Sequence, residues 1–401
     1  SLPRSGMTEA LASPPVAAAA PRWATHLECS RTGVTAPLDE PASLSPAGAP
    51  WLVRYDLAGR DGAAWARELS TRDRGLWRYR ELLPVVDFAR RVDLGEGGTP
   101  LVPLRRLAPA GVEALVKEEA GNPTGSFKAR GMALAVTRAR ELGIPGVELA
   151  SAGNAALAAC AYAAAAGMPA RVAMPPDTPG AIPARCRALG AEVLLVGATL
   201  VESRAALLER PAGLFDLSTF REPYRVEGKK TMGLEIAEQL GWELPDWILY
   251  PTGGGTGIVG MLAAFRQLQE LGLVGGRLPR LVVVQAEGCA PIVRALDRGG
   301  EAEPWEDPQT RAWGLRVPRA LAAPLVLAAV RETGGCGVTV SEDEMAEATG
   351  RLARAEGMEV GPEGAAAFVA LEKLTARGTV REGERVVVFQ TGNPSNYIEH
   401  A

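Results

Sequence analysis

The stretch Asn122-Pro123-Thr124-Gly125-Ser126-Phe127-Lys128-Ala129-Arg130-Gly131 decides how the rest of the chain is interpreted. Its Pro and Gly favour a turn, and the run after it is rich in Ala, Met and Leu, which predicts a helix that begins beside Lys128. A helix N-terminus disfavours a cation, so Lys128 should tend toward the neutral amine that a Schiff-base lysine requires. The chain has only five lysines among 43 Lys and Arg residues, which favours a chemical use for this amine. A solvated lysine at a helix start fits the local sequence equally well.

Composition and charge limit the class of protein. The chain has 401 residues, is 47% hydrophobic and carries a net charge of −4, which is typical of a globular protein with two or three domains. No basic block stands apart from acidic residues, so no nucleic-acid partner is expected. No charge-free run of eighteen apolar residues occurs, so no membrane span is expected. The five cysteines have no C-x-x-C spacing, so neither a zinc site nor a disulfide framework is expected. A reducing cytoplasm is the expected location. Cys160 and Cys186 should be small buried side chains.

Short apolar strands alternate with helical runs from residue 98 onward. The expected strands cover residues 115–117, 147–150, 171–174, 192–196, 247–250, 281–285 and 385–389. The expected helices cover residues 129–142, 154–167, 181–190, 199–209, 231–240, 258–271, 341–356 and 362–376. This alternation predicts an α/β fold in which a parallel sheet carries helices on both faces. Ligands bind such sheets at the loops after the carboxyl ends of the strands.

The N-terminal part has a different character. Residues 1–22 are Ala- and Pro-rich and are expected to form a disordered tail; the six residues before Met7 are left out of the fold prediction. Residues 61–91 predict helix and turns with an apolar stripe. The stripe consists of Trp65, Leu69, Leu76, Trp77 and Leu82. Its tryptophans are interpreted as core residues rather than as a stacking platform for a ligand.

Two loops offer backbone N–H groups to an anion. Ser151-Ala152-Gly153-Asn154 joins a strand to a helix N-terminus, although an ordinary N-cap serine would look the same. In the second loop, repeated glycines allow the backbone to close around a phosphate. This loop is Thr252-Gly253-Gly254-Gly255-Thr256-Gly257. It lacks the G-K-[ST] ending of a P-loop, and the next strand ends at Gln285 where a dinucleotide site would have an acidic residue. A tight structural turn is the alternative.

Two further segments carry polar groups. Thr391 lies just after the strand 385–389 and could donate a hydrogen bond to a ring nitrogen, or simply cap the strand. The segment 218–231 contains four cations and two carboxylates before the expected helix 231–240. Such a cluster is more often a solvated face. The guanidinium of Arg225 could instead bind a phosphate in bidentate fashion.

Taken together, these segments resemble threonine synthases, which are fold-type II enzymes that use pyridoxal 5'-phosphate (PLP). The resemblance covers roughly residues 52–391. It implies two three-layer α/β/α domains with the cofactor in the cleft between them. The large domain would comprise residues 93–135 and 225–401, and the small domain residues 136–224. The resemblance also implies a homodimer. It also implies that residues 23–92 are an N-terminal extension with a degenerate cysteine knuckle. Only Cys29 remains of the metal ligands, and Thr32 stands where a second cysteine is expected, so no metal is expected.

The resemblance also implies roles for individual residues. Lys128 would bind PLP as a Schiff base and then move protons on the substrate. The cofactor phosphate would lie on Gly253, Gly254, Gly255, Thr256 and Gly257. The PLP hydroxyl would contact Asn154, and the pyridine nitrogen would contact the neutral hydroxyl of Thr391, which leaves that nitrogen largely unprotonated. The substrate carboxylate would bind at Ser151, Ala152, Gly153 and Asn154, and the substrate phosphate at Arg225 and Lys229.

The implied reaction converts O-phospho-L-homoserine and water to L-threonine and phosphate by γ-elimination and β-addition of water. One departure concerns the C-terminal segment Thr391-Gly392-Asn393-Pro394-Ser395-Asn396-Tyr397, where family members often read Thr-Gly-Ser-Gly-Leu-Lys-Tyr. The alternative is therefore a divergent relative that performs β- or γ-replacement or a dehydratase-like elimination on another O-activated or hydroxy amino acid. A PLP-binding protein without turnover ranks last, because Lys128 and both anion loops are intact.

Overall fold

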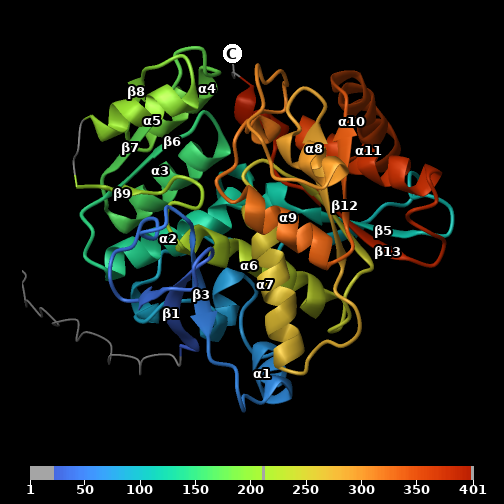
Figure 1. Cartoon of the computed structure of the whole chain (residues 1–401), viewed down its shortest axis with the longest axis horizontal. Coiled ribbons are helices and arrows are strands. Elements are labelled where there is room, and N and C mark those ends of the chain that lie inside the picture. The colour runs from blue at the N-terminus through green and yellow to red at the C-terminus, as the bar shows by residue number, and fades with distance from the viewer. Residues whose placement is uncertain (1–21, 210–212, 399–401) are drawn as a thin grey trace, which may run out of the picture.

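A computed structural model describes residues 22–209 and 213–398, and its larger sheet has six strands (Figure 1). The order is β12-β11-β10-β13-β5-β4, and every pair is parallel except β4 with β5. The strands are β4 (Leu101–Pro103), β5 (Glu113–Glu118), β10 (Trp247–Pro251), β11 (Arg280–Ala286), β12 (Cys336–Val340) and β13 (Arg385–Gln390). The central strands are buried on both faces, which explains their continuous Val, Ile and Leu runs.

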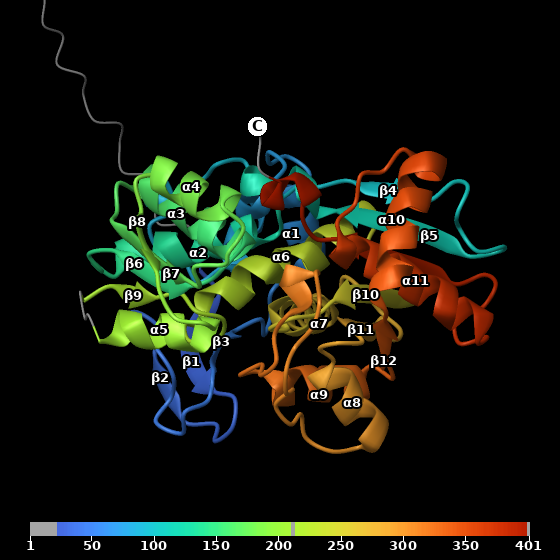
Figure 2. The ribbon, with the colours of Figure 1, turned by 90° about the horizontal axis from the view of Figure 1, so that it is seen from above.

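Helices cover both faces of this sheet, as Figure 2 shows. Alternate residues of β11 separate the two cores: Val282 and Val284 pack toward one set of helices, Leu281 and Val283 toward the other. The first set is α10 (Glu342–Glu356) and α11 (Pro362–Ala376). The second set is α6 (Tyr224–Gln239), α7 (Thr256–Glu270), α8 (Pro291–Arg298) and α9 (Ala323–Glu332). The result is a three-layer α/β/α unit.

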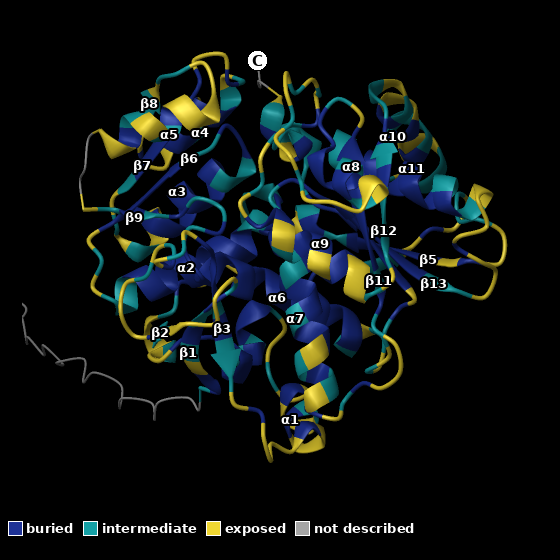
Figure 3. Cartoon of the chain, viewed as in Figure 1, coloured by how far each residue is buried: buried dark blue, intermediate teal, exposed yellow. Residues whose placement is uncertain are grey.

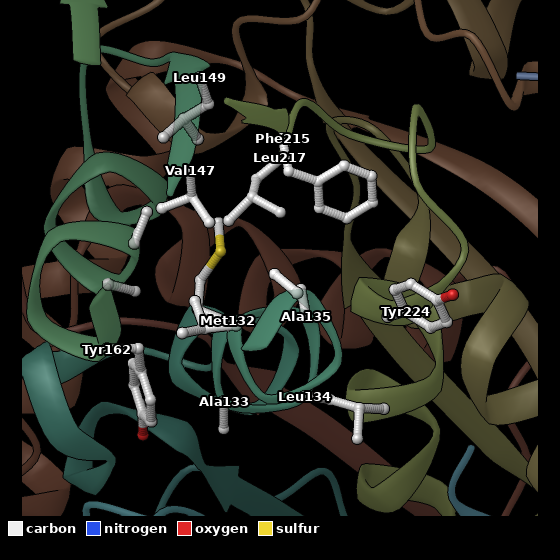
Figure 4. Packing of buried hydrophobic residues seen from close by; sticks show 14 of the residues in the cluster. Met132, Ala133, Leu134, Ala135, Val147, Leu149, Tyr162, Phe215, Leu217 and Tyr224 are labelled. Carbon is white, nitrogen blue, oxygen red and sulfur yellow. The ribbon is translucent and has the colours of Figure 1, made fainter. Parts of the chain in front are cut away.

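The second sheet has four parallel strands in the order β8-β7-β6-β9. They are β6 (Val147–Ala150), β7 (Ala170–Met174), β8 (Glu192–Leu195) and β9 (Phe215–Asp216). One face packs on α2 (Lys128–Glu141), α3 (Asn154–Ala166) and α4 (Ala181–Ala188), and α5 (Leu200–Leu208) covers the other. Figure 4 shows Met132 reaching from α2 toward Val147 in this core. The alanines of α3 let it pack closely against α2.

The N-terminal segment forms a small antiparallel sheet of β1 (Ala24–Cys29), β2 (Thr35–Pro37) and β3 (Trp51–Tyr55), followed by α1 (Gly62–Leu69). Cys29 is buried, and its Sγ lies 3.1 Å from Ser45 Oγ. No group of three or more His, Cys, Asp or Glu side chains within the described ranges is arranged to hold a metal ion. The described helices include none long and apolar enough to cross a membrane. The expected disorder of residues 1–22 falls almost wholly outside the described residues.

The predicted α/β fold and all seven predicted strands are confirmed, with bounds that differ by a few residues at most. The apolar stripe of residues 61–91 is buried, so its interpretation as core is confirmed, and Cys160 and Cys186 are buried as expected. The sequence did not predict the N-terminal strands, β4, β9, β12, α8 or α9. These are short or flanked by Gly and Pro, so their periodicity is weak.

Two predictions for residues 218–231 are wrong. The helix begins at Tyr224 rather than at 231, because Glu222 Oε2 accepts hydrogen bonds from the backbone N–H groups of Tyr224 (2.6 Å) and Arg225 (2.9 Å). The cationic cluster is also not a solvated face, since Arg225, Lys229 and Lys230 are at most 2% exposed. Figure 3 shows α2 and α6 buried together in the middle of the molecule.

A buried ion network joins α2, α6 and β5. Arg130 Nε donates to Glu119 Oε2 (2.7 Å), and its two terminal nitrogens donate to the carboxylate of Glu235 (both 2.7 Å). Lys117 Nζ lies 2.8 Å from the same carboxylate. Burial would raise the pKa of Glu235, but Arg130 and Lys117 outweigh burial and hold that pKa well below its usual range. The network is complete, with each charge paired.

Removing one member of this network should destabilise the fold strongly. Arg130→Met leaves the carboxylates of Glu119 and Glu235 buried without their main partner, so the free energy of unfolding should fall by about 3–5 kcal/mol. Chemical denaturation measures this change. Arg266→Met is the matched control, because the Arg266–Glu332 pair is exposed and its loss should change stability by less than about 1 kcal/mol. Equal effects of the two variants would contradict the prediction.

Candidate active site

Lys128 is the first residue of α2 and follows a tight turn at Pro123–Gly125. Thr124 and Gly125 both have left-handed backbone conformations, with φ of 60° and 74°. The loop is tied to the end of β13, where Phe127 N–H donates to Thr391 O (3.0 Å). Lys128 and Thr391, predicted to act on the same cofactor, therefore belong to adjoining segments.

The environment of Lys128 favours a neutral amine. Burial and the nearby charge of Arg225 lower the pKa of Lys128 to about 7, against the opposing effect of Glu363. The Nζ atom lies 4.2 Å from the centroid of the Phe127 ring. A lysine with this pKa is a competent nucleophile toward an aldehyde near neutral pH.

The glycine loop leads from β10 into α7 and has no room for side chains. A Cβ atom at Gly254 would lie 2.6 Å from Thr219 Cγ2, and Cβ atoms at Gly255 and Gly257 would collide with Val326 and Tyr250. No side chain caps the N-terminus of α7. Among the described residues, no hydrogen bond engages the backbone N–H groups of residues 253–257. Free N–H groups at a helix N-terminus on a loop of this shape fit a phosphate.

Two buried cations lie beside this loop. Lys229 Nζ is 3.5 Å from Thr256 Oγ1, and burial, then the charges of Arg225 and Lys128, hold the pKa of Lys229 well below its usual range. Arg225 Nη1 donates to the Leu217 carbonyl and lies 3.5 Å from Thr219 Oγ1. The pair predicted to bind a substrate phosphate thus adjoins the loop predicted to bind the cofactor phosphate.

Buried carboxylates near these cations are easy to protonate. Burial raises the pKa of Glu222 to about 7, against Arg225 and the two backbone N–H groups that its carboxylate accepts. Burial also raises the pKa of Glu363, in the first turn of α11, and Lys128 opposes that shift. Glu363 Oε1 accepts a hydrogen bond from Gly314 N–H (2.8 Å). Neither carboxylate fully neutralises the cationic site, which leaves it receptive to anions.

The loop of residues 151–154 connects β6 to α3, and Asn154 is the first residue of that helix. Asn154 Oδ1 accepts a hydrogen bond from Asn396 Nδ2 (2.7 Å). A Cβ atom at Gly392 would lie 2.9 Å from Asn154 Nδ2, which places this amide beside the end of β13. Ser151 Oγ accepts from Gly153 N–H at 3.4 Å, and Ala152 is buried.

Three residues at the site were not singled out by sequence reasoning. The charge of Glu363 opposes the lowering of the Lys128 pKa, Asn396 donates a hydrogen bond to Asn154, and Tyr397 Oη occupies the space beside Gly153 that a Cβ atom would need. The only signal for them was the unusual C-terminal segment, in which Asn396 stands at the position of the lysine in the family phrase. Nothing in the local pattern marks Glu363.

This arrangement points to a class of enzyme, because it combines two α/β units, a lysine of low pKa and a glycine loop whose free N–H groups fit a phosphate. Residues 92–392 match the family described as "Pyridoxal-phosphate dependent enzyme". The chain is 35% identical to the threonine synthase of Methanocaldococcus jannaschii (91% of each chain) and 39% identical to that of Methanosarcina acetivorans (81% of each chain). Its fold is similar to the processed form of threonine deaminase isoform 2 from Solanum lycopersicum, with a TM-score of 0.62 and 26% identity over 74% of this chain and 83% of that one. The protein belongs to the family of PLP-dependent enzymes and is a lyase of the fold-type II class.

The structure thus has groups that fit PLP. The glycines of residues 253–257 leave space for its phosphate, and Lys128 can react with its aldehyde. Asn154 and Thr391, which both adjoin the end of β13, can meet its ring hydroxyl and ring nitrogen. Bound PLP supplies an electron sink for the bonds at the substrate Cα. The residue assignments remain predictions.

The pKa of Lys128 predicts the pH dependence of cofactor capture. The neutral amine is the form that reacts with PLP. The rate at which cofactor-free protein captures PLP should therefore increase with pH, with a midpoint near pH 7, and level off above it. With an ordinary lysine pKa of about 10.4, the rate would still be increasing at pH 9. The rate of appearance of the visible absorption band measures capture. Arg225→Met removes a neighbouring cation and should move the midpoint upward. A midpoint above about pH 9 in the unmodified protein would contradict this assignment.

A side chain on the glycine loop should prevent cofactor binding. Gly254→Val places methyl groups against Thr219 and into the phosphate position, so PLP occupancy after dialysis should fall by more than about tenfold. Gly275→Val is the matched control, because no atom lies within 4 Å of a Cβ atom at that exposed position. Cofactor content, measured by absorption after alkaline release, should be unchanged in the control. Full occupancy in Gly254→Val would exclude this loop as the phosphate site.

Proposed function

We propose that the protein converts O-phospho-L-homoserine and water to L-threonine and phosphate, as a threonine synthase-like enzyme. The observation that supports this most is the grouping of Lys128 with Arg225 and Lys229, a reactive amine beside two buried cations. A substrate that carries both a carboxylate and a phosphate suits such a site. The extent of the similarity to relatives named threonine synthase, 91% of both chains in one case, agrees with this choice.

The residues divide the work as follows. The amine of Lys128, with a pKa of about 7, can remove protons from the substrate Cα and Cβ near neutral pH, deliver one to Cγ as phosphate leaves, and return one to Cα after water has added at Cβ. Backbone N–H groups at the start of α3 bind and orient the substrate carboxylate. Arg225 binds the phosphate that leaves from Cγ; its Nε is buried and has no hydrogen-bond partner among the described residues. Water then adds at Cβ.

A second function rests on the C-terminal segment. Asn396 replaces the lysine of the family phrase, and the fold is similar to a threonine deaminase. These observations favour, as the alternative, replacement or dehydratase-like elimination on another O-activated or hydroxy amino acid. Elimination from a hydroxy amino acid would need no phosphate-binding cation, so the buried charge of Arg225 argues for the first proposal.

We also propose a division into a large domain of 93–135 and 225–401 and a small domain of 136–224, supported by the two separate sheets. A homodimer in the cytoplasm is likewise proposed, from the resemblance to threonine synthases.

A product assay tests the proposed function. Purified protein with PLP is incubated separately with O-phosphohomoserine, O-phosphoserine, serine and threonine, and phosphate, amino acids and 2-oxo acids are quantified. Release of equal amounts of phosphate and threonine from O-phosphohomoserine supports the proposal. Formation of a 2-oxo acid from serine or threonine, without turnover of O-phosphohomoserine, would establish the alternative.

Arg225→Ala should impair substrate handling more than cofactor binding. Loss of a charge-assisted contact with the substrate phosphate should lower kcat/KM about ten- to a hundredfold, with PLP content almost unchanged. Arg266→Ala is the matched control, because its guanidinium is exposed and pairs with Glu332. If Arg225→Ala loses PLP but keeps a normal kcat/KM once PLP is restored, the assignment is wrong.

A further inference from the structure

Asn396 is a buried residue that joins three segments around the site. It lies in the short helical turn Pro394–Tyr397 that follows β13, and it is 3% exposed. Its Nδ2 donates to Thr124 O (2.9 Å) in the turn before Lys128 and to Asn154 Oδ1 (2.7 Å) at the start of α3. Its Oδ1 accepts from Arg185 Nη1 (2.8 Å) on α4.

These partners fix the orientation of the Asn396 amide. A guanidinium can only donate hydrogen bonds, so the atom that faces Arg185 must be the oxygen. A carbonyl can only accept, so the atom that faces Thr124 O must be the nitrogen. In the reverse orientation, the Asn396 NH₂ group would face the Arg185 guanidinium, and the Asn396 oxygen would face the Thr124 carbonyl. Neither contact could be a hydrogen bond, and unpaired polar groups are most unfavourable in a buried position.

The orientation of Asn396 in turn fixes that of Asn154. Because Asn396 Nδ2 donates this hydrogen bond, the Asn154 atom that accepts it must be Oδ1. The NH₂ group of Asn154 therefore points away from Asn396. That NH₂ group lies beside Gly392, next to Thr391 at the end of β13. The Asn154 amide could otherwise flip and exchange its oxygen and nitrogen. The hydrogen bond with Asn396 therefore holds its NH₂ group toward the proposed position of the cofactor ring.

We propose that Asn396, itself held by Arg185, is a positioning residue that keeps the amide donor of Asn154 directed at the ring oxygen of PLP. The proposal rests on the role of Asn154 toward the cofactor and not on the identity of the substrate. A donor at this place stabilises the anionic form of the ring oxygen and strengthens cofactor binding. A carbonyl oxygen at the same place would repel the anionic ring oxygen and weaken cofactor binding.

Asn396→Asp tests the proposal with little change in volume. The carboxylate keeps its contact with Arg185 but can only accept hydrogen bonds, so Asn154 must turn its NH₂ group toward residue 396 and its oxygen toward the cofactor. The dissociation constant of PLP, titrated into cofactor-free protein, should rise about tenfold or more. The ratio of the visible to the near-ultraviolet band of bound PLP should fall.

A double-mutant cycle separates positioning from general damage. In the Asn154→Ala background, Asn396→Asp should change the dissociation constant by less than about twofold, because the amide through which residue 396 acts is absent. An equally large loss in that background would overturn the proposal. Ser395→Ala is the matched control on the same turn, since the Ser395 side chain makes no hydrogen bond among the described residues.

Arg185 provides a second route if Asn396→Asp fails to fold, because Arg185 is only half-buried. Arg185→Glu replaces a donor by an acceptor and should lower the visible band and the PLP affinity in the same direction, whereas Arg185→Lys retains a donor and should preserve both. Unchanged spectra and affinities in Arg185→Glu, and in any folded Asn396→Asp, would overturn the proposal. These measurements use no substrate, so a failure of the proposed reaction leaves them unaffected.

Discussion

The close crossing of α2 and α6 is the constraint on which the site depends. Gly228 lies against the carbonyl of Arg130, where a Cβ atom would collide with it, and a Cβ atom at Gly131 would lie 2.9 Å from Lys229 Nζ. Further along α6, Glu235 pairs with the buried Arg130 and so joins the two helices again. Because Lys128 is the first residue of α2, while Arg225 and Lys229 lie on the first two turns of α6, this crossing brings all three basic side chains to one place.

Burial of these cations explains their chemistry. Burial lowers the pKa of all three residues, and the charge of Arg225 lowers the pKa values of Lys128 and Lys229 further. The carboxylates nearby, Glu222 and Glu363, have raised pKa values and do not remove the excess positive charge. Such a site gains most when anions enter it, because an anion near Lys229 opposes the lowering of the pKa of Lys229. The same desolvation that leaves Lys128 reactive therefore makes the site selective for phosphorylated or carboxylated ligands.

The sequence predicted the scaffold better than the site. The strand Val147–Ala150 and the helix Pro362–Ala376 have the predicted bounds, because apolar runs between turn residues identify buried strands and helices locally. The start of α6 was predicted seven residues too late, since its cap comes from the side chain of Glu222 and its glycines lower the apparent helix propensity. The number of charges in this segment also suggested a solvated environment for Lys229, which is in fact buried. Its burial depends on the packing of α2 against α6, which the local sequence does not show.

The contacts that shape the site lie beyond any local pattern. Asn396 and Asn154 are 242 residues apart, and Asn396 and Thr124 are 272 apart, yet each pair shares a hydrogen bond. Loops at the carboxyl ends of strands in two different sheets meet here, so a single short turn after β13 can contact both. A polar side chain in that turn is constrained by partners from both sides, whereas a strand residue such as Val284 is constrained only by the need to be apolar. For this reason the residues that distinguish one enzyme of this fold from another concentrate in such turns, while the long buried strands can be predicted from hydrophobicity.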